Sequence, residues 1–139
     1  MSDNQKSIEQ IIHQTVDMMS VRSVRDFTIP PMTYIGAGAV SCIGQVISER
    51  CAVGKVFVVM DEIIEKLDLA APMFRALKSR DIPWVEYIQP TGEPESKLVE
   101  EATRSFLQSG CDAIVAIGGG SALDAAKGIA LLAAHPNMT

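Results

Sequence analysis

The sequence is poor in the residues that mark disulfide-bonded, zinc-binding or nucleic-acid-binding proteins. It holds three cysteines, two histidines and no CxxC pair in 139 residues. An odd number of widely spaced cysteines indicates reduced thiols rather than a disulfide framework. Its 12 basic and 17 acidic residues are interspersed, with a net charge of −5. Because no Lys/Arg cluster is present, we expect no nucleic-acid partner.

Long apolar runs are also missing. None approaches the roughly 18 residues that span a bilayer, and the opening MSDNQKSIEQ lacks the basic start and apolar block of a secretory signal. We therefore expect a cytoplasmic protein with no membrane partner. What the sequence does contain, 47% apolar and 21% charged residues, is typical of a globular domain.

Residues 1–26 are expected to form a separate, helical extension. Six residues fall on one face of such a helix: Ile8, Ile11, Ile12, Thr15, Val16 and Met19. The helix would pack on the body of the protein or on a partner subunit, and a docking peptide is the alternative.

Residues 27–139 alternate between apolar strands and helices. Strands are predicted at 55–60, 84–88 and 112–117, with a further extended stretch near the two prolines at 30–31. Helices are predicted at 41–50, 62–80, 95–109 and 122–134, the third closed by Gly110 as a C-cap. Short, continuously apolar strands between helices predict an α/β fold, a Rossmann-like parallel sheet with helices on both faces. Ligands of such sheets bind outside the carboxyl ends of the strands.

Three glycines follow the third strand at one such end. Gly118, Gly119 and Gly120 clear every Cβ from the main chain, so that a bulky group can approach it. Ser121 is predicted to cap the next helix, with Asp124 completing a capping box. The free N–H groups of that helix would then form a phosphate cradle. The alternative is a tight strand-to-helix turn, for which one glycine would suffice.

Asp61 stands at the end of the first strand. Its carboxylate could accept hydrogen bonds from both hydroxyls of an adenosine ribose and would repel a 2′-phosphate, which favours NAD over NADP. A helix N-cap is a compatible second role. A rival fingerprint, Gly36-x-Gly38-x-x-Ser41, is close to G-x-G-x-x-G. Because prolines precede it and its helical stripe is weak, we interpret it as a structural turn.

Several segments together resemble a known family. GGGSALDAAKGIALL is similar to the GGGSxxDxAK signature of the iron-dependent (group III) alcohol dehydrogenases, and IPPMTYIGAGAVSCIG, VFVVMDE and SGCDAIVAIGGGS follow in that family's order. The segments PPMTYIGAGAVSCIGQ and PTGEPES look most like the ethanolamine-utilisation branch. One departure stands at Glu93, where many members carry the Asn of a Pro-Asn-Pro-Thr loop.

The resemblance implies an NAD-dependent enzyme that interconverts a primary alcohol and an aldehyde by hydride transfer. By position, Gly119, Gly120, Ser121 and Asp124 match cofactor-binding residues, and Asp61 matches the selector between NAD and NADP. The family's Fe²⁺ is held by an Asp and three His of a C-terminal helical domain, so no metal ligand and no catalytic residue is expected in this chain.

These implications define three readings. The first is that residues 27–139 are the dinucleotide-binding domain of a longer enzyme, inactive alone, that forms a homo-oligomer such as a dimer and resides in the cytoplasm or a bacterial microcompartment. The second is a non-catalytic nucleotide- or phosphate-binding module. The third is a sibling enzyme resembling glycerol dehydrogenase.

Overall fold

The computed structural model describes residues 33–90, 92 and 95–135. The chain divides into two compact units, Met1–Thr33 and Tyr34–Thr139, and the description below concerns the second. The predicted N-terminal helix, the boundary at 26/27, Glu93 and most of the extended stretch near the prolines lie outside the described residues. Residues 33–38, at the end of that stretch, form no strand.

Three parallel strands form the sheet. They are β1 (Val56–Asp61), β2 (Trp84–Gln89) and β3 (Ala113–Ile117), in the order β2-β1-β3. β1 is the central strand and its first five residues are buried, as the continuous apolar run VFVVM predicts. β3 is half-buried along its whole length, although its continuous apolar run is typical of a strand buried on both faces. β3 lies at the edge of this sheet.

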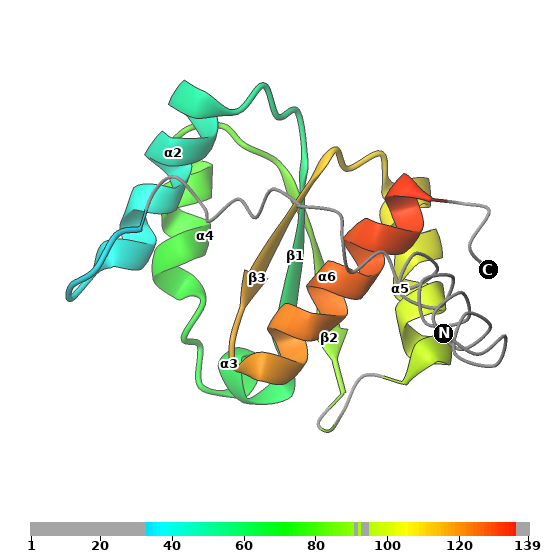
Figure 1. The fold of residues 1–139 in the computed structure, drawn as a ribbon. Coiled ribbons are helices and arrows are strands. Elements are labelled where there is room, and N and C mark those ends of the chain that lie inside the picture. Colours follow the sequence, from blue (N-terminus) through cyan, green and yellow to red (C-terminus); the bar gives the residue numbers. More distant parts are fainter. Residues whose placement is uncertain (1–32, 91, 93–94, 136–139) are drawn as a thin grey trace, which may run out of the picture. The chain divides into compact units, whose positions relative to one another are not determined.

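Helices cover both faces of the sheet (Figure 1). On one face, the short 3-10 helix η1 (Ala39–Cys42) leads into α2 (Ile43–Arg50), which packs beside α4 (Ala71–Lys78). On the other face lie α5 (Ser96–Ser109) and α6 (Gly120–Ala134), while the short α3 (Glu62–Lys66) directly follows β1. The α/β class with helices on both faces is thereby confirmed.

Alternation along the strands builds two separate cores. Val56, Val58 and Met60 of β1 pack with the α2–α4 layer. Phe57 and Val59, the residues between them, pack with α5 and α6. Successive side chains of a strand point to opposite faces, so one buried strand supplies both hydrophobic cores.

Two predicted elements need correction. The helix expected over 62–80 is two helices, because the chain turns between them with Asp68 at φ 51° and restarts with a proline in the first turn of α4. Leu69 lies in this turn and is 50% exposed. The N-terminal start of α6 also differs, since the helix begins at Gly120 rather than at Ala122.

Candidate cofactor-binding site

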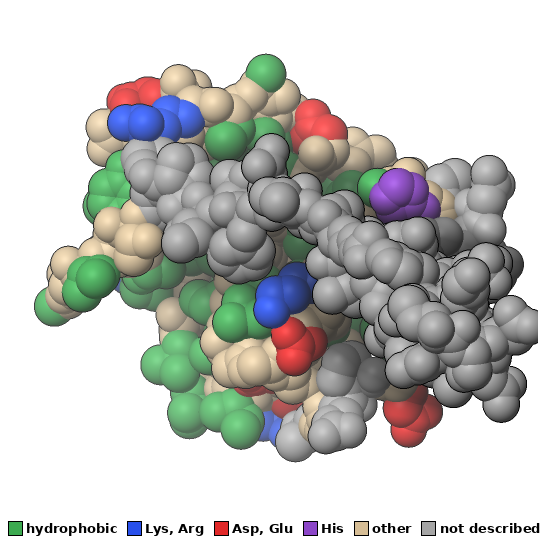
Figure 2. All heavy atoms as spheres, in the orientation of Figure 1, with side chains coloured by type: hydrophobic (Ala, Val, Ile, Leu, Met, Phe, Trp, Pro, Cys, Tyr) green, Lys and Arg blue, Asp and Glu red, His purple; other side chains and the backbone are tan. Residues whose placement is uncertain are grey.

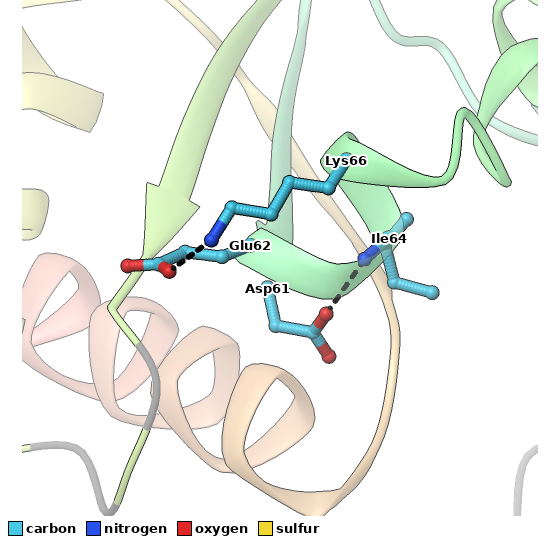
Figure 3. Close-up of polar contacts among 4 residues, drawn as sticks. All are labelled: Asp61, Glu62, Ile64 and Lys66. Carbon is cyan, nitrogen blue, oxygen red and sulfur yellow. Dashed lines mark hydrogen bonds and ion pairs between the residues drawn. The ribbon is translucent and has the colours of Figure 1, made fainter.

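Asp61 ends the central strand and caps the helix that follows. Its Oδ1 accepts a hydrogen bond of 2.9 Å from the backbone N–H of Ile64 (Figure 3). The neighbouring pair, Glu62 and Lys66, forms an ion pair of 3.0 Å along α3. Asp61 is half-buried. The N-cap role is confirmed, and it uses only one of the two carboxylate oxygens.

The second oxygen of Asp61 faces the first glycine of the loop. Gly118 has a φ of 142°, and a Cβ built on it would lie 2.7 Å from Asp61 Oδ2 and 3.1 Å from the Cβ of Ala122. Only glycine fits there without strain, because the conformation disfavours a side chain and the space is already filled. The ends of β1 and β3 and the start of α6 therefore meet at one point.

Gly119 and Gly120 border open space. A Cβ on either would meet no atom within 4 Å, and Gly119 has an ordinary φ of −84°. Neither packing nor the backbone conformation requires glycine at position 119. Together, Gly119 and Gly120 leave the main chain bare at the carboxyl edge of the sheet.

The start of α6 carries no side-chain cap. Gly119 is the N-cap residue, and no side chain accepts a hydrogen bond from the first turn. A hydrogen bond of 3.2 Å runs from the N–H of Leu123 to the carbonyl of Gly119, so the N–H groups of residues 120–122 precede it and have no intrahelical partner. With the positive end of the helix dipole, they form a site for an anion.

The predicted role of Ser121 as a cap is wrong. Its hydroxyl donates to the carbonyl of Gly92, in the loop between β2 and α5. This contact joins residues 29 positions apart and links that loop to the first turn of α6. The capping box with Asp124 is wrong for the same reason, since the cap lies two residues earlier.

Asp124 lies on the exposed surface of α6. Its Oδ1 pairs with Lys127 Nζ at 3.0 Å, and the side chains of Lys127 and Asp124 are 78% and 64% exposed. In the described part of the chain, the structure thus brings Asp61, Gly118 and the start of α6 together, while a cofactor contact of Asp124 stays a prediction.

Gln89 is a residue that the sequence analysis missed. It ends β2, pairs in register with Asp61, and is only 1% exposed. Its side-chain nitrogen, Nε2, has no hydrogen-bond partner. The signal was present in the sequence, because a glutamine closes an apolar strand at the edge where ligands bind.

The rival glycine fingerprint is a turn. The N–H of Ala39 donates to Gly36, and the N–H of Ser41 donates to Gly38, at 3.2 and 3.0 Å. This turn leads through η1 into α2, on the face opposite to α6. The amides of Ala39 and Ser41 are thus engaged by the chain itself.

No group of three His, Cys, Asp or Glu side chains that could hold a metal ion occurs within the described ranges. In the same ranges, none of the helices has both the length and the hydrophobicity to cross a bilayer. Cys42, Cys51 and Cys111 are all free thiols, as predicted. Charged side chains of both signs are scattered over the face seen in Figure 2.

The sequence model of the family described as "Iron-containing alcohol dehydrogenase" matches residues 30–139. The chain belongs to this family. Its relatives include proteins named "Probable alcohol dehydrogenase EutG" from Salmonella typhimurium and Escherichia coli, each 34% identical over 135 residues, which cover 97% of this chain and 34% of the relative. The NAD-dependent methanol dehydrogenase of Bacillus methanolicus is 33% identical over 79% of this chain and 29% of its own length.

Solved structures agree with the family assignment. The chain superposes on 1,3-propanediol oxidoreductase with a TM-score of 0.74 and 26% identity, over 81% of this chain and 29% of that one. It superposes on the NADH-dependent butanol dehydrogenase A of Thermotoga maritima with a TM-score of 0.69 and 28% identity, over 78% and 27%. The resemblance found in the sequence, with the branch to which it pointed, is confirmed. The chain spans about a third of the length of the EutG relatives.

Proposed function

We propose that residues 27–139 bind NAD(H) at the carboxyl edge of the sheet and form the cofactor-binding part of an iron-containing alcohol dehydrogenase. The observation that carries this proposal is the uncapped start of α6, whose amides lie beside two glycines that border open space. The printed names of an NAD-dependent and an NADH-dependent relative support the choice of cofactor.

The residues present suit a dinucleotide. The N–H groups of Gly120, Ser121 and Ala122 would hold the diphosphate, because they lack intrahelical partners and lie at the positive end of α6. The carboxylate of Asp61, with one oxygen engaged by Ile64, would accept a hydrogen bond from the adenosine ribose and repel a 2′-phosphate. When bound, the nicotinamide supplies the acceptor or donor of hydride for a small alcohol or aldehyde substrate.

Iron does not fit the described residues, since no suitable group of ligands occurs among them. We assign no catalytic residue to this chain and derive no step that passes through a metal. The substrate, the homo-oligomeric state and the cellular location stay predictions.

A titration of the 139-residue chain with NADH tests the proposal. Binding should be followed through the fluorescence of the nicotinamide or by calorimetry. The fluorescence of Trp84 is a poor reporter, because Trp84 begins β2 and so lies at the amino ends of the strands, away from the site. Its ring stacks on that of Phe74, with the ring centroids 5.2 Å apart. Saturable NADH binding is expected. Binding of inorganic phosphate or pyrophosphate without any binding of NADH would instead support a module for other phosphate ligands.

Matched glycine variants sharpen this test. Gly119→Ala places a methyl group in the open space beside the amides without disturbing the fold, so NADH affinity should fall while the unfolding temperature is kept. Gly54→Ala is the control for NADH affinity, because Gly54 precedes β1 at the opposite edge, has no positive φ, and its added Cβ would meet only the side chain of Asp112, with Oδ2 at 3.3 Å. Equal NADH affinity in both variants would contradict the proposed site.

A further inference from the structure

Gln89, whose side-chain Nε2 has no hydrogen-bond partner, is the neighbour of Asp61 across the sheet. The two residues pair in register at the ends of β2 and β1, and neighbouring strands lie about 4.8 Å apart. Val85 and Tyr87 of β2, like Phe57 and Val59 of β1, pack with α5 and α6. Alternation along both strands then places Gln89 and Asp61 on that same face.

The start of α6 is on this face too. Ile114 and Ala116 of β3 pack with α5 and α6 as well, so the same alternation brings the next position, Gly118, to the face that Gln89 and Asp61 share. Asp61 Oδ2 is already the atom nearest to the Cβ position of Gly118. One strand end thus offers an amide, the next a carboxylate and the third a bare main chain.

A buried N–H without a partner is costly. Nearly all buried polar groups in folded proteins are hydrogen-bonded, and an orphan donor destabilises the fold by its full desolvation penalty. At Gln89 the side chain is 1% exposed and Nε2 has no partner. An apolar residue of similar length would avoid this penalty, so the fold alone does not account for the amide.

We propose that the side-chain amide of Gln89 donates a hydrogen bond to a hydroxyl oxygen of the adenosine ribose that Asp61 binds. A hydroxyl group donates through its hydrogen and accepts through its oxygen. The carboxylate of Asp61 can only accept a hydrogen bond from the ribose hydroxyl, so the hydroxyl oxygen needs a separate donor. Gln89, next to Asp61 on β2, has such a donor unused in its Nε2. The terminal torsion of glutamine is broad, so the amide can turn toward the arriving group without movement of the backbone.

This inference rests on the proposed binding of NAD(H), and it makes a distinct claim. Gln89 is a specificity residue for the sugar and has no structural role that requires its amide. Replacing it by methionine, which has similar length and no donor, should therefore weaken binding without weakening the fold.

The experiment compares the wild-type chain with Gln89→Met in titrations with NADH. We expect the affinity of Gln89→Met to fall about three- to tenfold, the loss of one ordinary hydrogen bond, and its unfolding temperature to stay equal or rise. Gln108→Met, on the exposed surface of α5, is the control and should bind as the wild type does. Gln89→Leu provides a second apolar variant in case Gln89→Met does not fold.

A pair of ligands locates the contact on the sugar. ADP and 2′,3′-dideoxy-ADP differ only in the ribose hydroxyls, so Gln89→Met should weaken the binding of ADP and leave that of the dideoxy compound unchanged. An equal loss for both ligands would overturn the assignment to the ribose. Unchanged NADH affinity, with or without a lower unfolding temperature, would overturn the proposal for Gln89 alone. If the wild type binds no NADH, the proposed function fails instead.

Discussion

Gly118 and Gly119 are neighbours in the chain, but only one of them is required by the fold. Gly118 has a positive φ that disfavours any side chain, and a methyl group there would lie 2.7 Å from Asp61 Oδ2. At Gly119 it would meet nothing. A glycine that the fold does not require, at the carboxyl edge of a parallel sheet, is what the proposed approach of a ligand to the main chain would need.

Substitution separates these two roles. Gly118→Ala should lower the free energy of unfolding by about 1–3 kcal/mol, the cost of holding a side chain in a disfavoured conformation, and it should displace the carboxylate of Asp61. Gly119→Ala should leave the free energy of unfolding unchanged. Urea denaturation of the two variants checks this prediction, and equal destabilisation by both would contradict it.

Asp61 is the second residue whose substitution is informative. Asp61→Gly should raise the affinity for NADPH relative to NADH by roughly tenfold, because a carboxylate a few ångströms from a phosphate is repelled by about 1–4 kcal/mol at intermediate to high dielectric constant. Glycine at an N-cap costs only a few tenths of a kcal/mol, so α3 should persist. The measurement is a pair of titrations for each protein. An unchanged preference would remove Asp61 as the selector.

At the scale of the elements, the turn before β3 is fastened to the start of β1. The carboxylate of Asp112 accepts hydrogen bonds from the backbone N–H groups of Gly54 and Lys55, at 2.8 and 3.0 Å. The hydrogen bond from Lys55, followed by the one from Gly54, lowers the pKa of Asp112 below its ordinary value of 3.8. Lys55 Nζ also donates to the carbonyl of Ser109, at the end of α5.

The lowered pKa of Asp112 predicts an acid-dependent part of the stability. Because the folded state holds the carboxylate charged more strongly than the unfolded state does, this contribution is present above pH 3.8 and is lost as the pH falls through the folded-state pKa. Asp112→Ala should be less stable than the wild type at pH 7, with the difference shrinking toward pH 3. Urea denaturation across this range measures it, with Glu65→Ala, an exposed carboxylate of α3, as control. A difference that is constant with pH would contradict the assignment.

The contact between α2 and α4 depends on another glycine. A Cβ on Gly44 would collide with the backbone carbonyl of Ala76, and a backbone atom cannot move aside as the end of a side chain can. Gly44→Ala should therefore destabilise the fold by about 1–3 kcal/mol, although alanine favours a helix over glycine by about 1 kcal/mol. Thermal unfolding tests this, and a stabilised variant would show that the two helices can separate at little cost.

The elements that were predictable from sequence are those with a local signal. Apolar runs located β1, β2 and β3, and Gly110, found at φ 68°, ended α5 as expected. The break between α3 and α4 also had a local signal, Pro72, which was overlooked. The partner of Ser121 could not be read from the sequence, because Gly92 is brought to it by the tertiary fold.

At the scale of the whole molecule, the site is made by the order of the strands. Asp61, Gln89 and Gly118 are far apart in sequence and come from three different strand ends, and only the arrangement β2-β1-β3 makes the end of β1 adjacent to the other two. Sequence analysis could identify Asp61 and the glycines separately. The sequence shows that Gln89 closes a strand at this edge, but its burial and its register with Asp61 are visible only in the fold.

In the proposed site, the bare amides between β3 and α6 bind the diphosphate of NAD(H). The most direct measurement is the ¹H–¹⁵N spectrum of the labelled chain during titration with NADH. The largest shifts are expected at the amides of Gly120, Ser121 and Ala122, with smaller ones near Asp61 and none at Gly36 or Gly38. Saturable shifts centred on Gly36 and Gly38, with the amides of residues 120–122 unmoved, would contradict the proposed site.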